Sequence, residues 1–261
     1  MKRKLIAIFL SIVIFMFLLG GIVSYRLFAK VSFKTEQSTP PSHALWDALL
    51  KDYVIDGKVN YQLLYNNKEQ LNTYLNLLQS HVPVVNWSRN EQLAYWINAY
   101  NAFTIKIILD HYPVKSIKDI GGKVQIPLVN STWDIQFIEI GGKELSLNDI
   151  EHRILRQEFN EPTIHFAIVC ASKSCPLLRS EAYKAINIDE QLNEQALLFI
   201  NDQSKNHLAA DRIEISKIFS WFEGDFIKDG SLIEFLNKYS STRINQNAKI
   251  GNLDYDWALN D

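Results

Sequence analysis

The 261-residue sequence predicts an α+β fold: a single exported domain with N-terminal helices, a β-hairpin and a small mixed sheet, preceded by one transmembrane helix. Three observations lead to this prediction. The N-terminus is a long apolar run, the part after it has helical periodicity, and later segments alternate apolar with polar residues. A hydrophobic fraction of 47% and a charged fraction of 21% exclude global disorder, and a net charge of −2 gives no reason to expect a nucleic-acid partner.

Residues 5–23 form an uncharged apolar run that directly follows the basic residues 1–4. At 1.5 Å per residue this run spans roughly 28 Å, close to the hydrocarbon thickness of a bilayer. Basic flanks stay in the cytoplasm, so we expect residues 1–29 to be a signal anchor that crosses the inner (plasma) membrane once and leaves the C-terminal domain outside the cytoplasm. A cleaved signal peptide is the alternative, but the apolar cores of signal peptides are usually shorter.

Residues 30–42 are polar and contain prolines, which predicts a tether. No internal repeat and no second linker divides the rest of the chain. We therefore expect one extracytoplasmic domain over residues 43–261, long enough to bury roughly 70% of the surface of the unfolded chain.

Apolar residues at helical spacing predict helices over residues 43–54, 63–79 and 90–111. The last of these is the strongest, because its apolar residues keep the i, i+3, i+4, i+7 spacing over several turns. Pro113 marks its end.

The pattern changes after these helices. Residues 132–140 alternate apolar with polar side chains, and Gly141-Gly142 offers a hairpin turn before residues 143–145. Ser146 and Asp149 form the pattern of a capping box, which predicts a helix to about Arg156. The elements expected after this helix are a buried strand over 164–170, a helix over 190–201, a strand over 212–218, and helices over 219–226 and 231–239.

The segment from His165 to Arg179 carries the strongest chemical signal. Cys170 is expected where a strand runs into a loop of small residues, and nearby positive charge would lower the pKa of its thiol. A histidine would then act as the base, and the N–H groups of residues 171–174 would hold the oxyanion. The predicted catalytic residues are Cys170, His165, His152 and Asn98, and the predicted substrate-binding residues are Asn101, Ser172, Ser174 and Arg179.

Geometry limits this prediction, because His165 and Cys170 are five residues apart and would point to opposite faces of a regular strand. Three alternatives for the cysteines remain open. Cys170 and Cys175 could form a disulfide if the chain folds back to bring their Cα atoms within about 7 Å, they could be inert buried thiols, or they could bind zinc together with two histidines. The zinc spacing matches no strong signature, so no metal ligand is assigned.

Other polar and aromatic residues admit two interpretations. Asn98 and Asn101 face the same way on their helix, and would either orient a histidine and bind a substrate carbonyl or hold a neighbouring loop. Asp149 and Glu151 resemble a carboxylate pair, although Asp149 fits the capping box better. Six tryptophans would line a carbohydrate or peptide groove, or belong to the core. No Gly-rich phosphate loop is present, and no cofactor is expected.

Four motifs in the same order resemble the family called domain of unknown function 547. They are WINAYNA (96–102), SLNDIEHRIL (146–155), HFAIVCASKSCP (165–176) and IFSWFEGDF (218–226), and the resemblance covers about residues 90–239. It implies that His152, His165, Cys170 and Pro176 belong to the recurring pattern, and that Cys170 is more informative than Cys175, which is serine or aspartate in plant-like members. It also suggests a papain-like or transglutaminase-like fold, and it brings no established activity.

These observations together indicate an uncharacterised, membrane-anchored, extracytoplasmic protein. The leading hypothesis is a cysteine-dependent hydrolase or acyl transferase that acts on peptide, amide or ester groups in the cell envelope. The alternatives are a non-catalytic module that binds an envelope peptide, glycan or protein, and a zinc-stabilised domain. Apart from the membrane, which residues 5–23 would enter, no partner is identified.

Overall fold

The computed structural model describes residues 31, 33, 38–122, 124–126, 128 and 130–261. The expected anchor over residues 1–29 and part of the tether over 30–42 lie outside the described residues, so both stay predictions. Within the described part, no helix combines the length and the apolar character needed to cross a bilayer.

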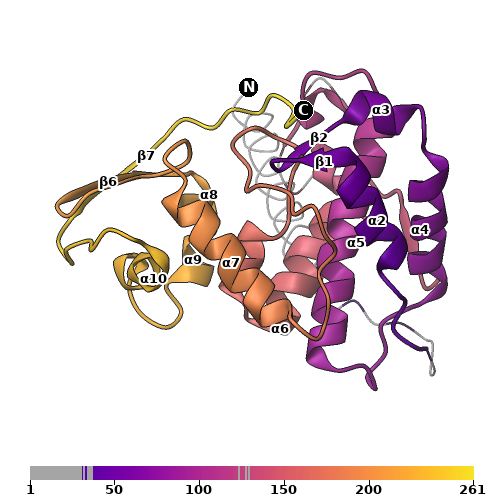
Figure 1. The fold of residues 1–261 in the computed structure, drawn as a ribbon, viewed down its shortest axis with the longest axis horizontal. Coiled ribbons are helices and arrows are strands. Elements are labelled where there is room, and N and C mark those ends of the chain that lie inside the picture. Colours follow the sequence, from indigo (N-terminus) through magenta and orange to yellow (C-terminus); the bar gives the residue numbers. More distant parts are fainter. Residues whose placement is uncertain (1–30, 32, 34–37, 123, 127, 129) are drawn as a thin grey trace, which may run out of the picture.

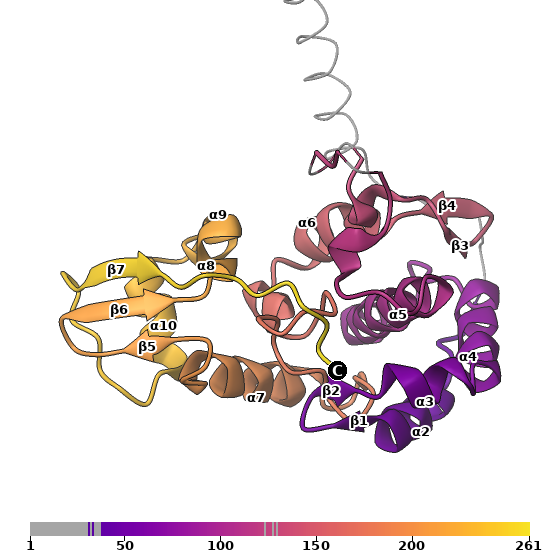
Figure 2. The same ribbon diagram turned by 90° about the horizontal axis from the view of Figure 1, so that it is seen from above.

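A mostly helical half comes first and packs around one long helix (Figures 1 and 2). Its helices are α2 (Ala44–Tyr53), α3 (Tyr61–Tyr65), α4 (Glu69–Ser80) and α5 (Arg89–Asp110), and the hairpin β1 (Val54–Ile55) and β2 (Lys58–Val59) joins α2 to α3. The predicted helices are confirmed, although the second one is broken into α3 and α4. Helix α5 begins at a capping box, in which Ser88 Oγ accepts from the N–H of Glu91 and Glu91 accepts from the N–H of Ser88.

The predicted hairpin in the middle of the chain is confirmed. Strands β3 (Ile138–Ile140) and β4 (Lys143–Leu145) pair antiparallel. Gly141 and Gly142 both have positive φ angles in the turn, as a tight two-residue hairpin requires. The strand is shorter than expected, because residues 132–134 form the 3₁₀-helix η2 (Thr132–Asp134), in which Asp134 accepts from the N–H and hydroxyl of Ser131.

A π-helix follows the hairpin, where the sequence predicted an ordinary helix. It is η3 (Asp149–Leu155), and it continues into the short helix α6 (Arg156–Phe159). Asp149 accepts from the N–H and the hydroxyl of Ser146, so the predicted capping interaction is present. π-Helical turns widen a helix locally and are frequent at functional sites.

The buried strand predicted over residues 164–170 was wrong. The structure has a 3₁₀-helix, η4 (Pro162–Phe166), and then an irregular segment. Instead of a strand partner, Asn101 on α5 pairs with this segment: its amide donates to the carbonyl of Ala167 and accepts from the N–H of Val169. Because no strand forms here, His165 and Cys170 are not constrained to opposite faces.

The second half combines helices with a small mixed sheet. Its elements are α7 (Ile188–Asn201), β5 (His207–Leu208), β6 (Arg212–Ile215), α8 (Ile218–Trp221), α9 (Glu223–Phe226), α10 (Leu232–Tyr239) and β7 (Lys249–Asn252). Strand β6 pairs antiparallel with β5 and parallel with β7, so the predicted small mixed sheet is confirmed. The sequence predicted β6 but neither of its partner strands. Phenylalanines from η4, α7, α8, α9 and α10 form a second hydrophobic cluster beside this sheet.

The C-terminal segment after β7 crosses back to the first half of the molecule (Figures 1 and 2). Near its end, the carbonyl of Asn260 accepts from the N–H of Val59, and the side chain of Asn260 accepts from the hydroxyl of Tyr61. Residues from both halves therefore meet along this segment. The prediction of one domain over residues 43–261 stays a prediction.

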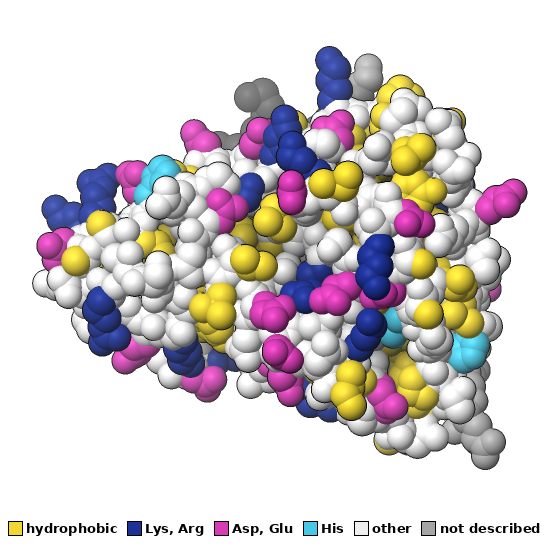
Figure 3. All heavy atoms as spheres, in the orientation of Figure 1, with side chains coloured by type: hydrophobic (Ala, Val, Ile, Leu, Met, Phe, Trp, Pro, Cys, Tyr) yellow, Lys and Arg dark blue, Asp and Glu magenta, His cyan; other side chains and the backbone are white. Residues whose placement is uncertain are grey.

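The observed class is α+β, as predicted. Sheets of two, two and three strands are present in the described chain, and nothing in this arrangement supports a papain-like or transglutaminase-like fold. On the face drawn in Figure 3, charged side chains of both signs are interspersed.

Candidate functional site

A pocket of about 520 Å³ lies where the two halves meet. Its walls come from α5, η2, η3, η4 and the segment after it, α8 and the C-terminal segment. The lining residues used below are Tyr100, Lys118, Trp133, Glu151, His152, His165, Cys170, Cys175, Trp221, Phe222, Tyr255 and Trp257. Three predicted catalytic residues, Cys170, His165 and His152, are thus brought together from three different segments.

Cys170 and Cys175 form a disulfide, with their Cα atoms 6.3 Å apart. The expectation of a free Cys170 thiol is therefore corrected, and the disulfide left open by the sequence is the arrangement observed. The chain folds back because Ala171 adopts a positive φ of 58° and the N–H of Cys175 donates to the carbonyl of Ser172. This turn brings the Cα atoms within the range that a disulfide needs.

Two hydroxyl groups surround the sulfurs. Ser172 Oγ and Tyr255 Oη each lie 3.2 Å from Cys175 Sγ and 3.5 Å from Cys170 Sγ. Burial raises the pKa of the Tyr255 phenol well above its usual value, so this hydroxyl keeps its proton at neutral pH. Ser172, a predicted substrate-binding residue, is buried and its hydroxyl contacts both sulfurs.

His165 is held rigidly with one ring nitrogen unbonded. Its Nε2 donates to the carboxylate of Asp225 at 2.8 Å, and its ring stacks on Phe222 with the centroids 4.0 Å apart. Its Nδ1 is buried and has no hydrogen-bond partner among the described residues. Burial lowers the pKa of His165 although the bond to Asp225 opposes this. The neutral ring carries its proton on Nε2, so the lone pair of the buried Nδ1 is not used in a hydrogen bond with the described residues.

Arg156 connects the two histidines through Asp225. Its guanidinium donates to Asp225 at 2.5 Å and to His152 Nδ1 at 2.8 Å. Burial, reinforced by the Arg156 charge, lowers the pKa of His152 to about 3, so His152 is neutral with its proton on Nε2. Burial opposes ionisation of Asp225, but hydrogen bonds from His165 and Arg156 outweigh it and keep the Asp225 pKa below its usual value.

Glu151 contributes a buried carboxyl to the same pocket. Burial raises its pKa to about 7, although the positive charge of Arg156 opposes this rise. The hydroxyl of Tyr100 on α5 donates to Glu151 Oε2 at 3.2 Å. The carboxyl therefore exists in both protonation states near neutral pH, as a general acid or base requires.

An aromatic wall closes the other side of the pocket. It consists of Trp133, Trp221, Tyr255 and Trp257, and neighbouring ring centroids lie 4.6–5.7 Å apart. Trp221 remains 46% exposed, so part of the wall is open to a ligand. Lys118 places its ammonium 5.0 Å from the centre of the Trp257 ring.

Four predicted site residues act elsewhere in the fold. Asn98 donates to the carbonyl of Tyr183 and accepts from its N–H, so it holds a loop instead of orienting a histidine. Asn101 holds the segment after η4, as described above. Ser174 Oγ accepts from the N–H of Asp256, and Arg179 pairs with Glu181 and Glu194.

Two of the four N–H groups predicted to hold the oxyanion, over residues 171–174, are used within the fold. The N–H groups of Lys173 and Ser174 donate to the carbonyls of Ala258 and Asp256 in the C-terminal segment. These donors are therefore already occupied by the protein.

Sequence reasoning did not assign roles to Asp225, Arg156 or Tyr255. Asp225 lies in the FEGDF motif, which was noted for the family resemblance alone, and Arg156 follows His152 by one helical turn. No local signal placed Tyr255 beside the cysteines, because only the path of the C-terminal segment brings it there.

The zinc alternative gains no support. Across the described residues, no group of three or more His, Cys, Asp or Glu side chains is arranged to hold a metal ion. Both sulfurs are joined to each other and so cannot ligate as thiolates.

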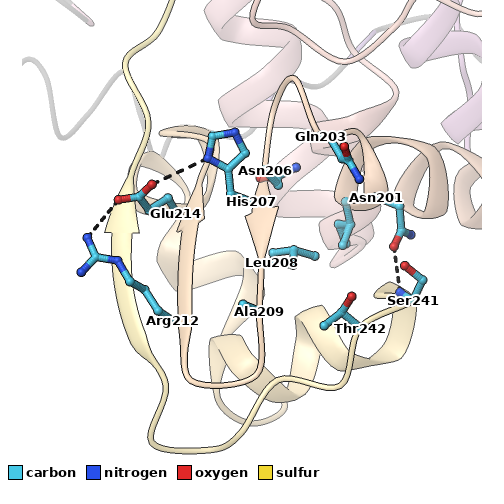
Figure 4. Close-up of a pocket in the computed structure, with 11 residues that line it drawn as sticks. Asn201, Gln203, Asn206, His207, Leu208, Ala209, Arg212, Glu214, Ser241 and Thr242 are labelled. Carbon is cyan, nitrogen blue, oxygen red and sulfur yellow. Dashed lines mark hydrogen bonds and ion pairs between the residues drawn. The ribbon is translucent and has the colours of Figure 1, made fainter.

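Figure 4 shows a second pocket, of about 480 Å³, beside β5 and β6. Its charged and polar side chains are paired locally: Glu214 with Arg212 and His207, and Asn201 with the N–H of Ser241. None of the buried polar atoms that lack a partner in the described chain belongs to its lining residues. We therefore place the functional site at the first pocket.

Comparison with protein families matches residues 84–200 to the family described as "Protein of unknown function, DUF547". Residues 84–200, slightly less than half of the chain, therefore match the DUF547 family. A search of curated proteins and a search of solved structures each found no match. The DUF547 match runs through α5, η3, η4 and α7, so it includes Glu151, both histidines and both cysteines. Asp225 and Tyr255 lie beyond it.

Proposed function

We propose that this DUF547 protein is a cysteine-dependent hydrolase or acyl transferase, anchored in the membrane through residues 5–23, that acts on peptide, amide or ester groups in the cell envelope. The observation that supports the proposal is that Cys170 and His165 line the same pocket, with His165 held by Asp225 and its Nδ1 unbonded. A nucleophile, a base and a carboxylate that orients the base are the parts of a catalytic triad.

The reaction starts from the form in which the disulfide has been reduced. The Cys170 thiol gives its proton to His165 Nδ1 and its sulfur attacks the substrate carbonyl, forming a tetrahedral intermediate and then a thioester. Asp225 stabilises the positive charge that His165 acquires. Protonated Glu151 or His165 gives a proton to the leaving group, and water or another acceptor then takes the acyl group from Cys170.

The negative oxygen of the intermediate needs donors, because the N–H groups of Lys173 and Ser174 are occupied. Tyr255 keeps its phenolic proton and lies beside the sulfurs, and His152 carries a proton on Nε2 in the same pocket. We assign the stabilisation of the oxyanion to these two groups.

The test uses Cys175→Ser, in which Cys170 is the one remaining cysteine and stays reduced. We expect iodoacetamide to alkylate Cys170 at pH 7 at least tenfold faster than free cysteine, because His165 increases the thiolate fraction. The added substitution His165→Ala should remove at least a factor of ten, while His207→Ala, an exposed histidine outside the pocket, should leave the rate unchanged. An activated acetyl ester should acetylate Cys170. A rate no faster than that of free cysteine, with no acetylated Cys170 by mass spectrometry, contradicts the proposal.

A binding module is the second candidate function, and the aromatic wall favours it. Stacked, partly exposed tryptophans offer flat apolar faces for a sugar or an aromatic side chain. If binding alone is the function, affinity for envelope glycans or peptides survives Cys170→Ala and is lost in Trp221→Ala, as calorimetry would measure.

The anchor is a separate part of the proposal, and it rests on residues 1–29. The full chain should stay with membranes through an alkaline carbonate wash and be released by detergent. Release by carbonate would contradict the anchor and leave the proposed chemistry untouched.

A further inference from the structure

We infer that Cys170 and Cys175 form a thiol–disulfide exchange site, in which an external thiol attacks Cys170 and Cys175 leaves as the thiolate. The partner is a small thiol or a protein dithiol that reaches the pocket. This inference goes beyond acyl transfer and does not depend on it, although exchange would release the thiol that acyl transfer needs.

The two sulfurs differ in access. Both cysteines line the pocket, but Cys170 is half-buried, whereas Cys175 is 3% exposed. An incoming thiolate must approach the attacked sulfur directly, so Cys170 is the sulfur that it can reach.

The two sulfurs also differ in their hydrogen bonds. Cys175 Sγ accepts from the N–H of Cys170 at 3.1 Å, and the hydroxyls of Ser172 and Tyr255 lie 3.2 Å from it. The same two hydroxyls are 3.5 Å from Cys170 Sγ. Donors stabilise a thiolate and lower the pKa of its thiol, which makes it the better leaving group. Access and leaving-group stability therefore favour the same direction of attack.

The exchange balances without a cofactor. The partner's thiolate forms a bond to Cys170 Sγ as the Cys170–Cys175 bond breaks, and the electron pair of that bond stays on Cys175. A second thiol of the partner, as its thiolate, then attacks the partner's own sulfur in the mixed disulfide and releases Cys170 as a thiolate. The partner dithiol is oxidised to a disulfide, and the protein disulfide is reduced to two thiols that take up the two protons.

The site of attack is tested first on the unaltered protein. The oxidised full chain in detergent is treated with excess glutathione, quenched in acid and digested, and the position of the glutathione adduct is mapped by mass spectrometry. We expect the adduct on Cys170. An adduct predominantly on Cys175, or a disulfide that glutathione and dithiothreitol reduce only after the protein is unfolded, overturns the inference.

Single-cysteine variants test the role of the donors. With Cys170→Ser, the pKa of the Cys175 thiol, followed by thiolate absorbance, should lie below the usual 8.5 or so. Adding Tyr255→Phe should raise that pKa by about half a unit to one unit, whereas Tyr239→Phe, a tyrosine outside the pocket, should not change it. If the pKa of the Cys175 thiol is at or above the usual value, or does not change in Tyr255→Phe, the assignment of Cys175 as the leaving group is overturned. Exchange at Cys170 without acetylation in the earlier test would retain this inference and reject acyl transfer.

Discussion

Glu151 makes the stability of the fold depend on pH, because burial raises the pKa of its carboxyl from about 4.5 to about 7. Between these two values the folded protein holds a proton that the unfolded chain has lost. Stability from this group is therefore fully present below the unfolded pKa and is lost as pH rises towards 7, by about 3 kcal/mol in total.

We expect Glu151→Gln to remove this loss, since an amide does not titrate and its oxygen can still accept from Tyr100. The measurement is urea unfolding of the full chain in detergent at pH 5 and pH 8, with the exposed Glu144→Gln as the control. His152 and His43 have lowered pKa values and contribute the opposite trend in all variants. Comparison with the native chain therefore gives the contribution of Glu151 to the pH dependence of stability. An unchanged pH dependence in Glu151→Gln would show that the pKa of this carboxyl is not raised in the folded protein.

The sequence shows that His165 is a candidate base, but it does not show the tautomer or the orientation of the ring. A histidine five residues before a cysteine suggests a base, but its role depends on which nitrogen is open. Asp225, on a helix far along the chain, accepts the hydrogen bond from Nε2–H. The identity of the candidate base was therefore predictable, whereas its tautomer and its orientation were not.

At the scale of elements, periodicity predicted the helices because apolar residues recur at helical spacing. Helix α4 is the clearest case, because its buried residues Leu71, Tyr74, Leu75 and Leu78 form one face, whereas α5 is buried on all sides over residues 93–105. The β3–β4 hairpin follows from its Gly-Gly turn. Residues 164–170 were wrongly predicted to form a strand, because an apolar, β-branched composition is equally suited to a buried irregular segment. What decides its form is Asn101 on a distant helix, which satisfies backbone groups that would otherwise need a strand partner.

This dependence predicts a large effect of Asn101→Ala. The substitution leaves the N–H of Val169 and the carbonyl of Ala167 buried without their partner, which should cost about 2–4 kcal/mol of stability. Urea unfolding measures the loss, and hydrogen exchange should show the Val169 amide losing protection. The exposed Asn72→Ala on α4 is the control. If Val169 stays protected, the segment has another source of order and the assignment to Asn101 is wrong.

At the scale of the whole molecule, the pocket exists because the chain returns on itself. Tyr100 and Glu151 come from the first half, Phe222 from the second, and Tyr255 and Trp257 from the C-terminal segment. Local sequence patterns identified the cysteines and histidines, since these stand in one motif-rich region. The tryptophans were noted as candidates for a groove, but the sequence did not show which of them form the aromatic wall, because its members meet only when the last residues cross between the halves.

The contacts of the C-terminal segment therefore predict how the region around the disulfide responds to a substitution at the end of the chain. Its end is held by Asn260, whose side chain accepts from the buried hydroxyl of Tyr61, and its middle covers the disulfide loop through bonds from Lys173 and Ser174. Asn260→Ala leaves the Tyr61 hydroxyl unpaired, so we expect a loss of about 1–2 kcal/mol. The amides of Lys173 and Ser174 should exchange faster and the disulfide should be reduced faster by dithiothreitol, because the segment that covers them is loosened. The exposed Asn247→Ala should change neither rate. Unchanged exchange at Lys173 and Ser174 in Asn260→Ala would mean that the aromatic wall and the bonds to Ala258 and Asp256 hold the segment without its end.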